Sequence, residues 1–394
     1  MSLLIKNGKV YQNGNLIRKN IFIKDNKITK ITSQELKSDN VIDAKNKIII
    51  PGLIDSHVHF REPGQTHKED FLTGSMAAAA GGITTFLDMP NTNPPTTDLQ
   101  KLGEKRKLAK KSIVNFGLHF GSTLDNISEI EKVTNVASIK IYMDYTTGDL
   151  KIDDLDVLKK IFLSGNMISV HAENENVAIA VKLSKETKNH FYLCHTSSKE
   201  ELDYAQGHAY IEVCPQHLFL TAKDLDSLGS FAEMKPGLKT MEDGKALWNA
   251  IYNGKVDTIA TDHAPHTKEE KYETNYPYGV PGCETMLPLL LHALNQKKIE
   301  LKKIVQLCCE NPASIFKIKN KGFIKENFDA DLTIIDMGME KEVKNDELFT
   351  KCKWSPFDGW KLKGWPVTTI VNGNIIFDNG KINNIAANEV SYND

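Results

Sequence analysis

Short apolar runs with the character of β-strands alternate with helical patterns through the middle of this chain, and this alternation limits the fold more than any other feature. A strand that is followed by a helix returns parallel to its neighbour. Eight such units predict a parallel sheet closed into a (β/α)8 TIM barrel, an α/β fold. We expect the strands near 48–55, 83–89, 115–121, 138–143, 167–171, 191–195, 210–214 and 258–261.

Helical patterns separate the predicted strands. Examples lie around 68–80, 153–163, 174–183 and 242–252, and two more, 286–295 and 301–316, follow the last strand. An open, doubly wound sheet is the alternative arrangement of such units. The Gly-x-Gly-x-x-Gly turn typical of dinucleotide-binding sheets does not follow the first predicted strand, which favours the closed barrel.

Both ends of the chain have a different pattern. They alternate apolar and polar residues and carry turn dipeptides such as Asn7-Gly8 and Asn13-Gly14, as a β-meander does. Two β-rich ends that are far apart in sequence can pair into one small domain. We therefore expect residues 1–50 and 325–394 to form a composite β-sandwich beside a barrel of residues 51–324.

Composition argues against several classes of protein. The formal net charge of −2 gives no basis for binding nucleic acid, and the longest apolar runs are too short to cross a membrane. The six cysteines have no spacing that suggests a disulfide framework, and the first residues lead into a strand pattern rather than a secretory leader. We expect a cytoplasmic protein whose partner is a small-molecule substrate.

Metal-ligand side chains recur at the ends of the predicted strands. His57 and His59 lie two residues apart on an extended segment, so both imidazoles point to one side and can reach one cation. Active sites of parallel barrels lie at the C-terminal ends of the strands, where one histidine is unremarkable but ligands on five strands are not. The set is His57, His59, Lys140, His171, His195 and Asp262.

This set is too large for one ion. Four histidines and one aspartate exceed the roughly four ligands of a single zinc ion and so predict two. Two zinc ions about 3.5–4 Å apart need a bridging anion to offset their repulsion. A carbamate formed from Lys140 and carbon dioxide would provide one, and the unmodified carboxylate of Asp144 is the alternative.

The segments around these residues resemble the dihydroorotases of the amidohydrolase superfamily, over nearly the whole chain. They are 51–64 (PGLIDSHVHFREPG), 88–92 (DMPNT), 139–142 (IKIY), 171–173 (HAE), 194–197 (CHTS), 259–266 (IATDHAPH), 281–285 (PGCET) and 354–359 (WSPFDG). The resemblance implies a barrel with a composite β-sandwich. It also allows a homodimer.

The resemblance implies a ligand set for two zinc ions. His57, His59 and Asp262 would hold one ion, His171 and His195 the other, and carboxylated Lys140 would bridge them. The Ile-Lys-Ile-Tyr setting is similar to that of lysine-bridged members and so favours Lys140 over Asp144. Some members further suggest a third metal contact through Cys194 and Glu212.

The implied reaction is the reversible cyclisation of N-carbamoyl-L-aspartate to L-dihydroorotate and water in de novo pyrimidine (UMP) biosynthesis. A hydroxide bridging the zinc ions is available at neutral pH, because metal binding lowers the pKa of water to roughly 7. Asp262 would act as general acid and base. Substrate contacts are expected from His59, Arg61, Asn91, His266, Pro281 and Gly282.

Other cyclic amidohydrolases, allantoinase and hydantoinase (dihydropyrimidinase), share the metals and are the alternative. Residues 171–174 and 214–218 resemble hydantoinase segments. Arg61, Asn91 and His266 instead favour an acidic substrate, since an arginine fork suits a carboxylate. A non-catalytic paralogue is a remote alternative, because all six ligand positions are filled.

Three positions depart from the family pattern. Gln216 stands where members often have the first of two adjacent histidines, and Lys235 stands where related members have arginine. Thr146-Thr147 replaces the Thr-Phe of a mobile loop over the substrate. These departures leave the detailed pocket and the closing contact of that loop open.

Overall fold

The computed structural model describes residues 2–146 and 148–393, and a parallel β-barrel forms its centre. The barrel strands are β8 (Leu53–Val58), β9 (Ile83–Asp88), β10 (Asn115–Leu118), β11 (Phe120–Gly121), β12 (Ile139–Tyr142), β13 (Ile168–His171), β14 (Phe191–Leu193), β15 (Ala209–Val213) and β16 (Thr258–Ile259). Each pairs in parallel with its sequence neighbour, except that His119 separates β10 from β11, two halves of one strand. A parallel bridge from Val58 to His263 closes the ring. The predicted barrel is confirmed.

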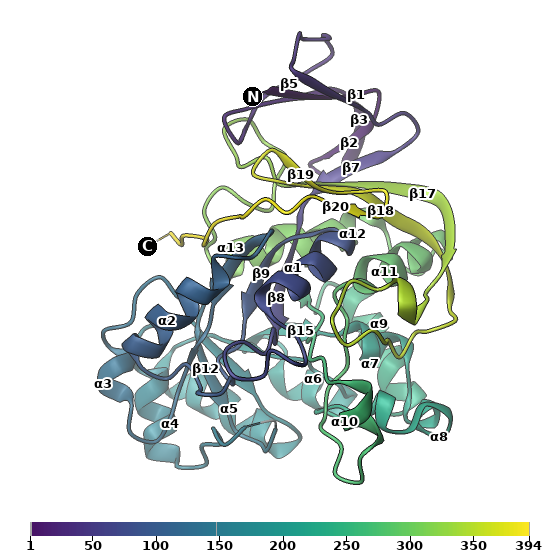
Figure 1. The fold of residues 1–394 in the computed structure, drawn as a ribbon. Coiled ribbons are helices and arrows are strands. Elements are labelled where there is room, and N and C mark those ends of the chain that lie inside the picture. Colours follow the sequence, from purple (N-terminus) through teal and green to yellow (C-terminus); the bar gives the residue numbers. More distant parts are fainter. Residues whose placement is uncertain (1, 147, 394) are drawn as a thin grey trace.

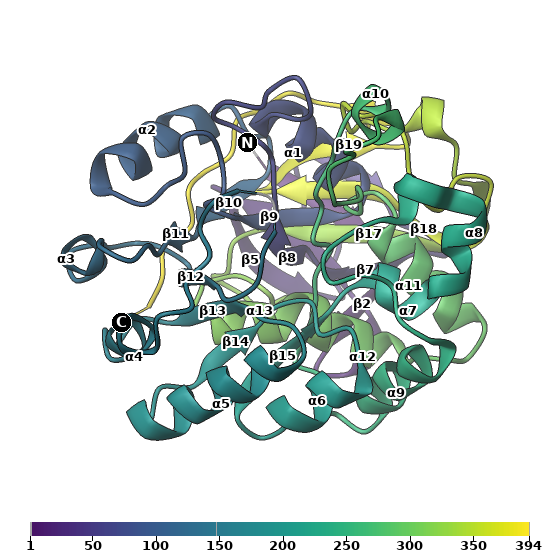
Figure 2. The same cartoon turned by 90° about the horizontal axis from the view of Figure 1, so that it is seen from below.

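Helices surround the barrel, as Figure 2 shows from below. They are α1 (Phe71–Ala80), α2 (Leu99–Ala109), α3 (Ile127–Ile130), α4 (Leu155–Phe162), α5 (Glu175–Thr187), α6 (Lys199–Ala205), α7 (Pro215–Phe219), α8 (Leu225–Leu228), α9 (Met241–Tyr252), α10 (Lys268–Tyr272), α11 (Met286–Asn295), α12 (Leu301–Val305) and α13 (Asn311–Ile315). A π-helical turn, Gln306–Glu310, joins the last two, which are the single helix predicted over 301–316. Of the helices in the described residues, none has the length and apolar character needed to cross a membrane.

Several helices begin directly after a side chain that can cap them. Asp70, Asp98, Asp154, Ser198 and Thr240 each stand one residue before a helix and accept hydrogen bonds from its first backbone N–H groups. These groups have no partner within the helix, so a capping oxygen stabilises the first turn. The helices therefore begin close to the predicted boundaries, one turn later for α1.

Two further sheets form a small domain at the top of Figure 1, where the purple N-terminal and yellow C-terminal strands lie together. One sheet has the order β5-β4-β1-β6 and the other β20-β19-β18-β17-β7-β2-β3. The strands are β1 (Ser2–Lys6), β2 (Lys9–Gln12), β3 (Asn15–Arg18), β4 (Asn20–Lys24), β5 (Lys27–Thr32), β6 (Asn40–Asp43), β7 (Ile48–Pro51), β17 (Leu332–Glu342), β18 (Lys361–Val371), β19 (Asn374–Asp378) and β20 (Lys381–Ile382). Buried aliphatic side chains from both chain ends, such as Ile5 and Leu332, share one core.

The strand predicted over 48–55 is two strands in two different sheets. β7 pairs with β17 and β2 in the small domain, whereas β8 pairs with β9 in the barrel. Gly52 is the only residue between them. A Cβ atom at Gly52 would lie 2.1 Å from Oγ1 of Thr84 in β9, so glycine is required where the chain passes from one sheet into the other. Periodicity gave no sign of this division, because both halves are apolar.

The range 325–394 predicts that the whole C-terminal part of the chain belongs to the small domain. The structure differs, because part of this range packs against the barrel. Val343, Trp354 and Phe357 share a buried cluster with barrel residues such as Met234 and Leu289. Near the end of the chain, Glu389 bridges in parallel to Phe116 of β10. The C-terminal third therefore contributes to the packing around the barrel as well as to the second sheet.

We predict that Gly52→Ala destabilises the protein by about 3 kcal/mol, because the new methyl group overlaps Thr84 of β9 and must displace it. Gly103→Ala is the matched control: a Cβ atom there meets nothing within 4 Å, and the position lies inside α2. The control should be neutral or stabilising, by up to about 1 kcal/mol. Urea unfolding of both variants measures the difference, and equal stabilities would contradict the packing argument.

Candidate active site

A pocket with about 380 Å³ of empty space, counted with its mouth, opens at the C-terminal ends of the barrel strands. It is lined by His57, His59, Arg61, Asn91, Lys140, Tyr142, Thr146, His171, His195, Lys235, Asp262, Ala264, Tyr278 and Gly279. All six predicted metal ligands are in this set. The loops after six different strands therefore converge on one site, as parallel barrel geometry requires.

Two histidines of β8 and its following loop meet the aspartate that follows β16. Oδ1 of Asp262 lies 3.3 Å from Nε2 of His57 and 3.1 Å from Nε2 of His59. One ligand atom from each of these residues lies within 4.8 Å of the other two, and all three residues are buried. Two imidazoles and a carboxylate at this spacing can bind one divalent cation.

The backbone at Asp262 is held in an uncommon conformation. Its φ is +48°, in the left-handed region that aspartate tolerates better than most residues. The preceding Thr261 is fixed by buried Asp55, whose carboxylate accepts from the threonine N–H at 3.0 Å and from its hydroxyl at 2.6 Å. The turn at Asp262 aims its carboxylate back over the barrel.

Charge and burial act together on these three residues. Burial lowers the pKa of His57, but the carboxylates of Glu212 and Asp262 outweigh it and raise that pKa to about 10. Burial lowers the pKa of His59 to about 4. Burial would raise the pKa of Asp262, but the two imidazoles outweigh it and hold the pKa far below its ordinary value. An anionic carboxylate beside a neutral imidazole suits a cation, which would also displace the proton of His57.

The second pair of histidines comes from the ends of β13 and β14. Nδ1 of His171 lies 2.8 Å from Nε2 of His195. Their other ring nitrogens, Nε2 of His171 and Nδ1 of His195, are buried without a hydrogen-bond partner. Burial lowers the pKa of both, to about 3 for His171, so both are neutral. Neutral imidazoles with unsatisfied nitrogen atoms have the chemistry of metal ligands, so this half of the site also fits a divalent ion.

Lys140 of β12 lines the same pocket as the two histidine pairs and is fully buried. Its Nζ donates to Sγ of Cys194 at 2.9 Å, and within the described residues no carboxylate lies within 4.0 Å of it. A buried ammonium group without a counter-ion is unfavourable, and a carbamate on this nitrogen would remove the positive charge. Asp144, the alternative bridge, instead accepts from the N–H of Glu173 and from the amide of Asn176, at the start of α5.

Glu212 of β15 supports the histidines from below. Its carboxylate accepts from Nδ1 of His57 at 2.8 Å, from the N–H of His195 at 2.7 Å and from the hydroxyl of Tyr192 at 2.7 Å. Donation from Nδ1 orients His57 and leaves Nε2 to face Asp262, the arrangement usual behind metal-binding histidines. Cys194, His57 and Glu212 also have ligand atoms within 4.8 Å of one another.

Arg61 forms the wall of the pocket beside the first metal-ligand set. Only 2% of this residue is exposed, its Nε donates to the carbonyl of Pro265 at 3.0 Å, and its Nη2 lies 2.9 Å from Nε2 of His266. In the part of the chain that the structure describes, no carboxylate forms an ion pair with it. Burial lowers its pKa to about 10. A buried guanidinium without an anion, facing a pocket, is a site for an acidic ligand.

His266 contacts Arg61 itself, and Asn91 contacts His59, two residues before Arg61 in the chain. His266 contacts Nζ of Lys68 through Nδ1 at 3.1 Å, and burial with Arg61 and Lys68 holds its pKa far below the ordinary value. Asn91 accepts from Nδ1 of His59 at 2.7 Å, which leaves the lone pair of Nε2 for a cation. His266 itself does not line the pocket but positions Arg61.

Pro281 and Gly282 do not line the pocket as predicted. They lie behind the loop that carries Tyr278 and Gly279, against His263. A Cβ atom at Gly282 would come within 3.0 Å of Thr261, which shows how closely this loop packs on the end of β16. The Pro-Gly motif therefore serves packing here, and the pocket wall is built by the residues before it.

The structure places Lys235, Gln216 and Thr146, which lie at the departures from the family pattern, in or beside the pocket. Lys235 lines the pocket with its Nζ 5.0 Å from the ring centre of Tyr278, and Gln216 donates to the carbonyl of Thr261 at 3.1 Å. Thr146 lines the pocket, and Thr147 lies outside the described residues. Sequence reasoning missed Tyr142, although strand alternation from Lys140 could have found it. The loop residue Tyr278 carried no such signal.

A buried ion pair supports the loops that carry Arg61 and Asn91. Nζ of Lys105, from α2, lies 2.6 Å from Oδ2 of Asp88 and donates to the carbonyl of Met89, and neither charged side chain is exposed. Oδ1 of Asp88 accepts from the N–H of Phe60 at 2.7 Å. The pair thus fixes the backbone directly before both substrate-facing loops.

Comparison with known proteins agrees with this geometry. The model of the amidohydrolase family matches residues 48–376. Dihydroorotases from Pyrococcus abyssi and Methanosarcina acetivorans are 39% and 36% identical, each over 96% of this chain and over 96% and 92% of their own. Among solved structures, L-hydantoinase from Arthrobacter aurescens has a TM-score of 0.93 at 28% identity and covers 99% of both chains. A D-hydantoinase has a TM-score of 0.89 at 27% identity, covering 97% of this chain and 96% of its own.

We predict that Lys105→Met destabilises the fold by about 3–5 kcal/mol, because it leaves the carboxylate of Asp88 buried without its counter-ion. Lys101→Met is the control on the same helix, since its partner Asp98 is partly exposed and such pairs contribute at most about 1 kcal/mol. Chemical unfolding measures both. A loss for Lys105→Met no larger than that of the control would show that the buried pair is dispensable.

Proposed function

The chain belongs to the amidohydrolase family, and we propose that within it the protein acts as a dihydroorotase. This enzyme interconverts N-carbamoyl-L-aspartate with L-dihydroorotate and water in pyrimidine biosynthesis. The dihydroorotases named above match this chain over nearly its whole length, and they support this assignment. The cytoplasm is its expected compartment, and a homodimer is its expected assembly.

One observation carries the choice of substrate: the buried guanidinium of Arg61 faces the pocket without a carboxylate partner among the described residues. A neutral ring such as hydantoin offers no anion to this group, whereas dihydroorotate carries a carboxylate. An arginine fork would bind it through two parallel hydrogen bonds and fix the ring relative to the metal ligands. Lys68, behind His266, is already paired with Glu270 at 3.1 Å, which leaves Arg61 as the cation offered to the ligand on this wall.

The metal-binding residues support a pair of zinc ions. His57, His59 and Asp262 would hold one ion, and His171 and His195 the other. Two bound zinc ions supply a hydroxide nucleophile at neutral pH and polarise the amide carbonyl that it attacks. The buried amine of Lys140, in the lining of the same pocket, would form a carbamate: its nitrogen would bond to the carbon of carbon dioxide and release a proton, and the resulting carboxylate would serve as the bridging ligand.

Asp262 is the proposed proton carrier. Its carboxylate is kept anionic by the two adjacent imidazoles, so it can accept a proton from the attacking nucleophile. The left-handed turn aims the same carboxylate into the pocket, where it can pass that proton to the leaving ring nitrogen. In the cyclisation direction the two transfers run in reverse.

The hydantoinases are the second candidate, because solved structures of that group share the fold closely. They differ from the first candidate in the substrate only, so a substrate panel separates them. Dihydroorotate, hydantoin, dihydrouracil and allantoin share the cyclic amide but differ in charge.

We predict that the purified protein contains about two zinc ions per chain and turns over dihydroorotate in preference to the uncharged rings. Elemental analysis measures the metal, and the loss of ring absorbance measures turnover. Turnover of hydantoin or allantoin without turnover of dihydroorotate would reassign the substrate.

We predict that Arg61→Met raises KM for dihydroorotate about 100-fold and lowers kcat far less, because the methionine keeps the volume but removes the partner of the carboxylate. Arg106→Met is the matched control, since Arg106 pairs with Glu389 away from the pocket. Steady-state kinetics of both variants measure the effect. A KM for Arg61→Met equal to that of the control would disprove the carboxylate contact.

A further inference from the structure

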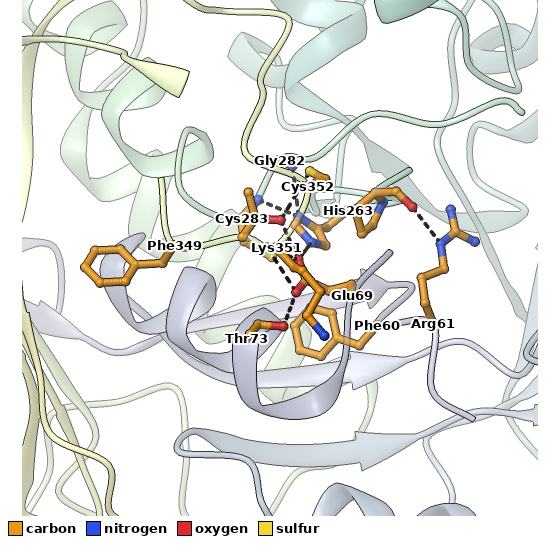
Figure 3. A network of polar contacts seen from close by, with 12 residues as sticks. Phe60, Arg61, Glu69, Thr73, His263, Gly282, Cys283, Phe349, Lys351 and Cys352 are labelled. Atoms are coloured by element: carbon orange, nitrogen blue, oxygen red, sulfur yellow. Dashed lines mark hydrogen bonds and ion pairs between the residues drawn. The ribbon is translucent and has the colours of Figure 1, made fainter. Parts of the chain in front are cut away.

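His263, the residue directly after Asp262, is buried and has no place in the reaction described above. Its Nδ1 accepts from two successive backbone groups, the N–H of Gly282 at 3.1 Å and the N–H of Cys283 at 3.3 Å. Figure 3 shows the imidazole between this loop and Glu69. One side chain thus connects the turn at Asp262 with a loop twenty residues further along the chain.

The two N–H donors determine the role of one ring nitrogen. Nδ1 must offer its lone pair to them, so this nitrogen carries no hydrogen. Nε2 faces Oε2 of Glu69 at a distance of 3.5 Å, and Glu69 is fully buried. This contact is longer than a hydrogen bond, so among the described residues only Nδ1 of the ring is hydrogen-bonded. The edge of the imidazole also packs against Phe60, with ring centres 5.6 Å apart.

Glu69 is held in turn by a segment from the C-terminal third of the chain. Its carboxylate accepts from the hydroxyls of Thr73 and Thr350 and from the N–H of Lys351 at 3.2 Å. Neighbouring Glu284 accepts from the N–H of Phe349 and the N–H of Thr350 at 2.9 Å each. Two carboxylates thus fix residues 349–351 against the loop, and Figure 3 shows part of this network.

The loop held by His263 forms one wall of the pocket. Tyr278 and Gly279 at its start line the pocket, and Val280 pairs in parallel with His263. A Cβ atom at Gly279 would lie 2.5 Å from the carbonyl oxygen of Ala264, so this wall is in tight contact with the end of β16. A shift of residues 282–283 would therefore move the wall that faces the substrate.

The same histidine borders the proposed proton carrier. The backbone N–H of His263 donates to Oγ1 of Thr261 at 3.0 Å, and the backbone carbonyl of His263 accepts from the N–H of His59 at 2.8 Å. The left-handed residue Asp262 thus lies between two residues with fixed backbones. A rotation of the His263 backbone would therefore shift both the carboxylate of Asp262 and the metal-binding residue His59.

We propose that His263 is a positioning residue: by accepting from the N–H groups of Gly282 and Cys283, it holds the loop 278–283 against Asp262 and so sets the distance between the substrate ring and the proton carrier. The proposal rests on the proposed function for its kinetic consequence, but the docking of the loop stands on the geometry alone. His263 itself touches neither the substrate nor the metal-binding atoms.

Two amide substitutions test the roles of the two ring nitrogens of His263 separately. His263→Asn puts an amide oxygen near the position of Nδ1 and can still accept from Gly282, whereas His263→Gln reaches the position of Nε2 and cannot. We expect His263→Gln to lower kcat/KM about 100-fold, largely through KM, with zinc content unchanged. His263→Asn should lose only about fivefold. In hydrogen exchange, the amides of Gly282 and Cys283 should exchange much faster in the Gln variant than in the Asn variant.

His292→Gln is the matched control, because Nδ1 of His292 also accepts a backbone N–H, from Lys363 at 3.1 Å, outside the pocket. It should leave kcat/KM unchanged. Equal losses in the Asn and Gln variants, or unchanged exchange of the two loop amides in the Gln variant, would overturn the proposal. If the parent enzyme fails to turn over dihydroorotate, the proposed function is wrong, and the exchange result still decides whether His263 holds the loop.

Discussion

Closure of the barrel between its first and last strands is the constraint on which the site depends. The N–H of His59 bonds to the carbonyl of His263 at 2.8 Å, and the bridge from Val58 to His263 completes the ring. This pairing brings Asp262 beside two histidines about two hundred residues away in sequence. The remaining ligands follow from the strand order, since each successive parallel strand adds one more end to the same rim.

The rim concentrates charged and polar groups where burial is costly. Arg61, Lys105, Lys140 and Asp262 are all at least nine-tenths buried, and only some of their charges are balanced by a neighbour. Lys105 has Asp88, whereas no ion pair to Arg61 or Lys140 appears in the described residues. The uncompensated groups are those that face the pocket, where a carboxylate ligand, carbon dioxide and cations can complete the balance.

Much of this arrangement could be predicted from the sequence, because the ligand residues follow apolar strands and parallel strands end on one side. The division at Gly52 could not, since it depends on the contact of a glycine with Thr84 rather than on hydrophobic period. The preference for Lys140 over Asp144 likewise depends on which side chain turns inward, and the hydrogen bonds that Asp144 forms at the start of α5 favour Lys140. The misplacement of Pro281 and Gly282 has the same origin: a motif identifies a loop but not the face that it presents.

The single residue between β7 and β8 has a mechanical consequence. Domains joined by long, pliant connectors can swing about them and so open or close a cleft. Here a single residue joins β7 to β8, and β7 is paired within a sheet that contains strands from both ends of the chain. We therefore expect entry of substrate and exit of product to depend on the loops around the mouth of the barrel rather than on a hinge between the two sheets.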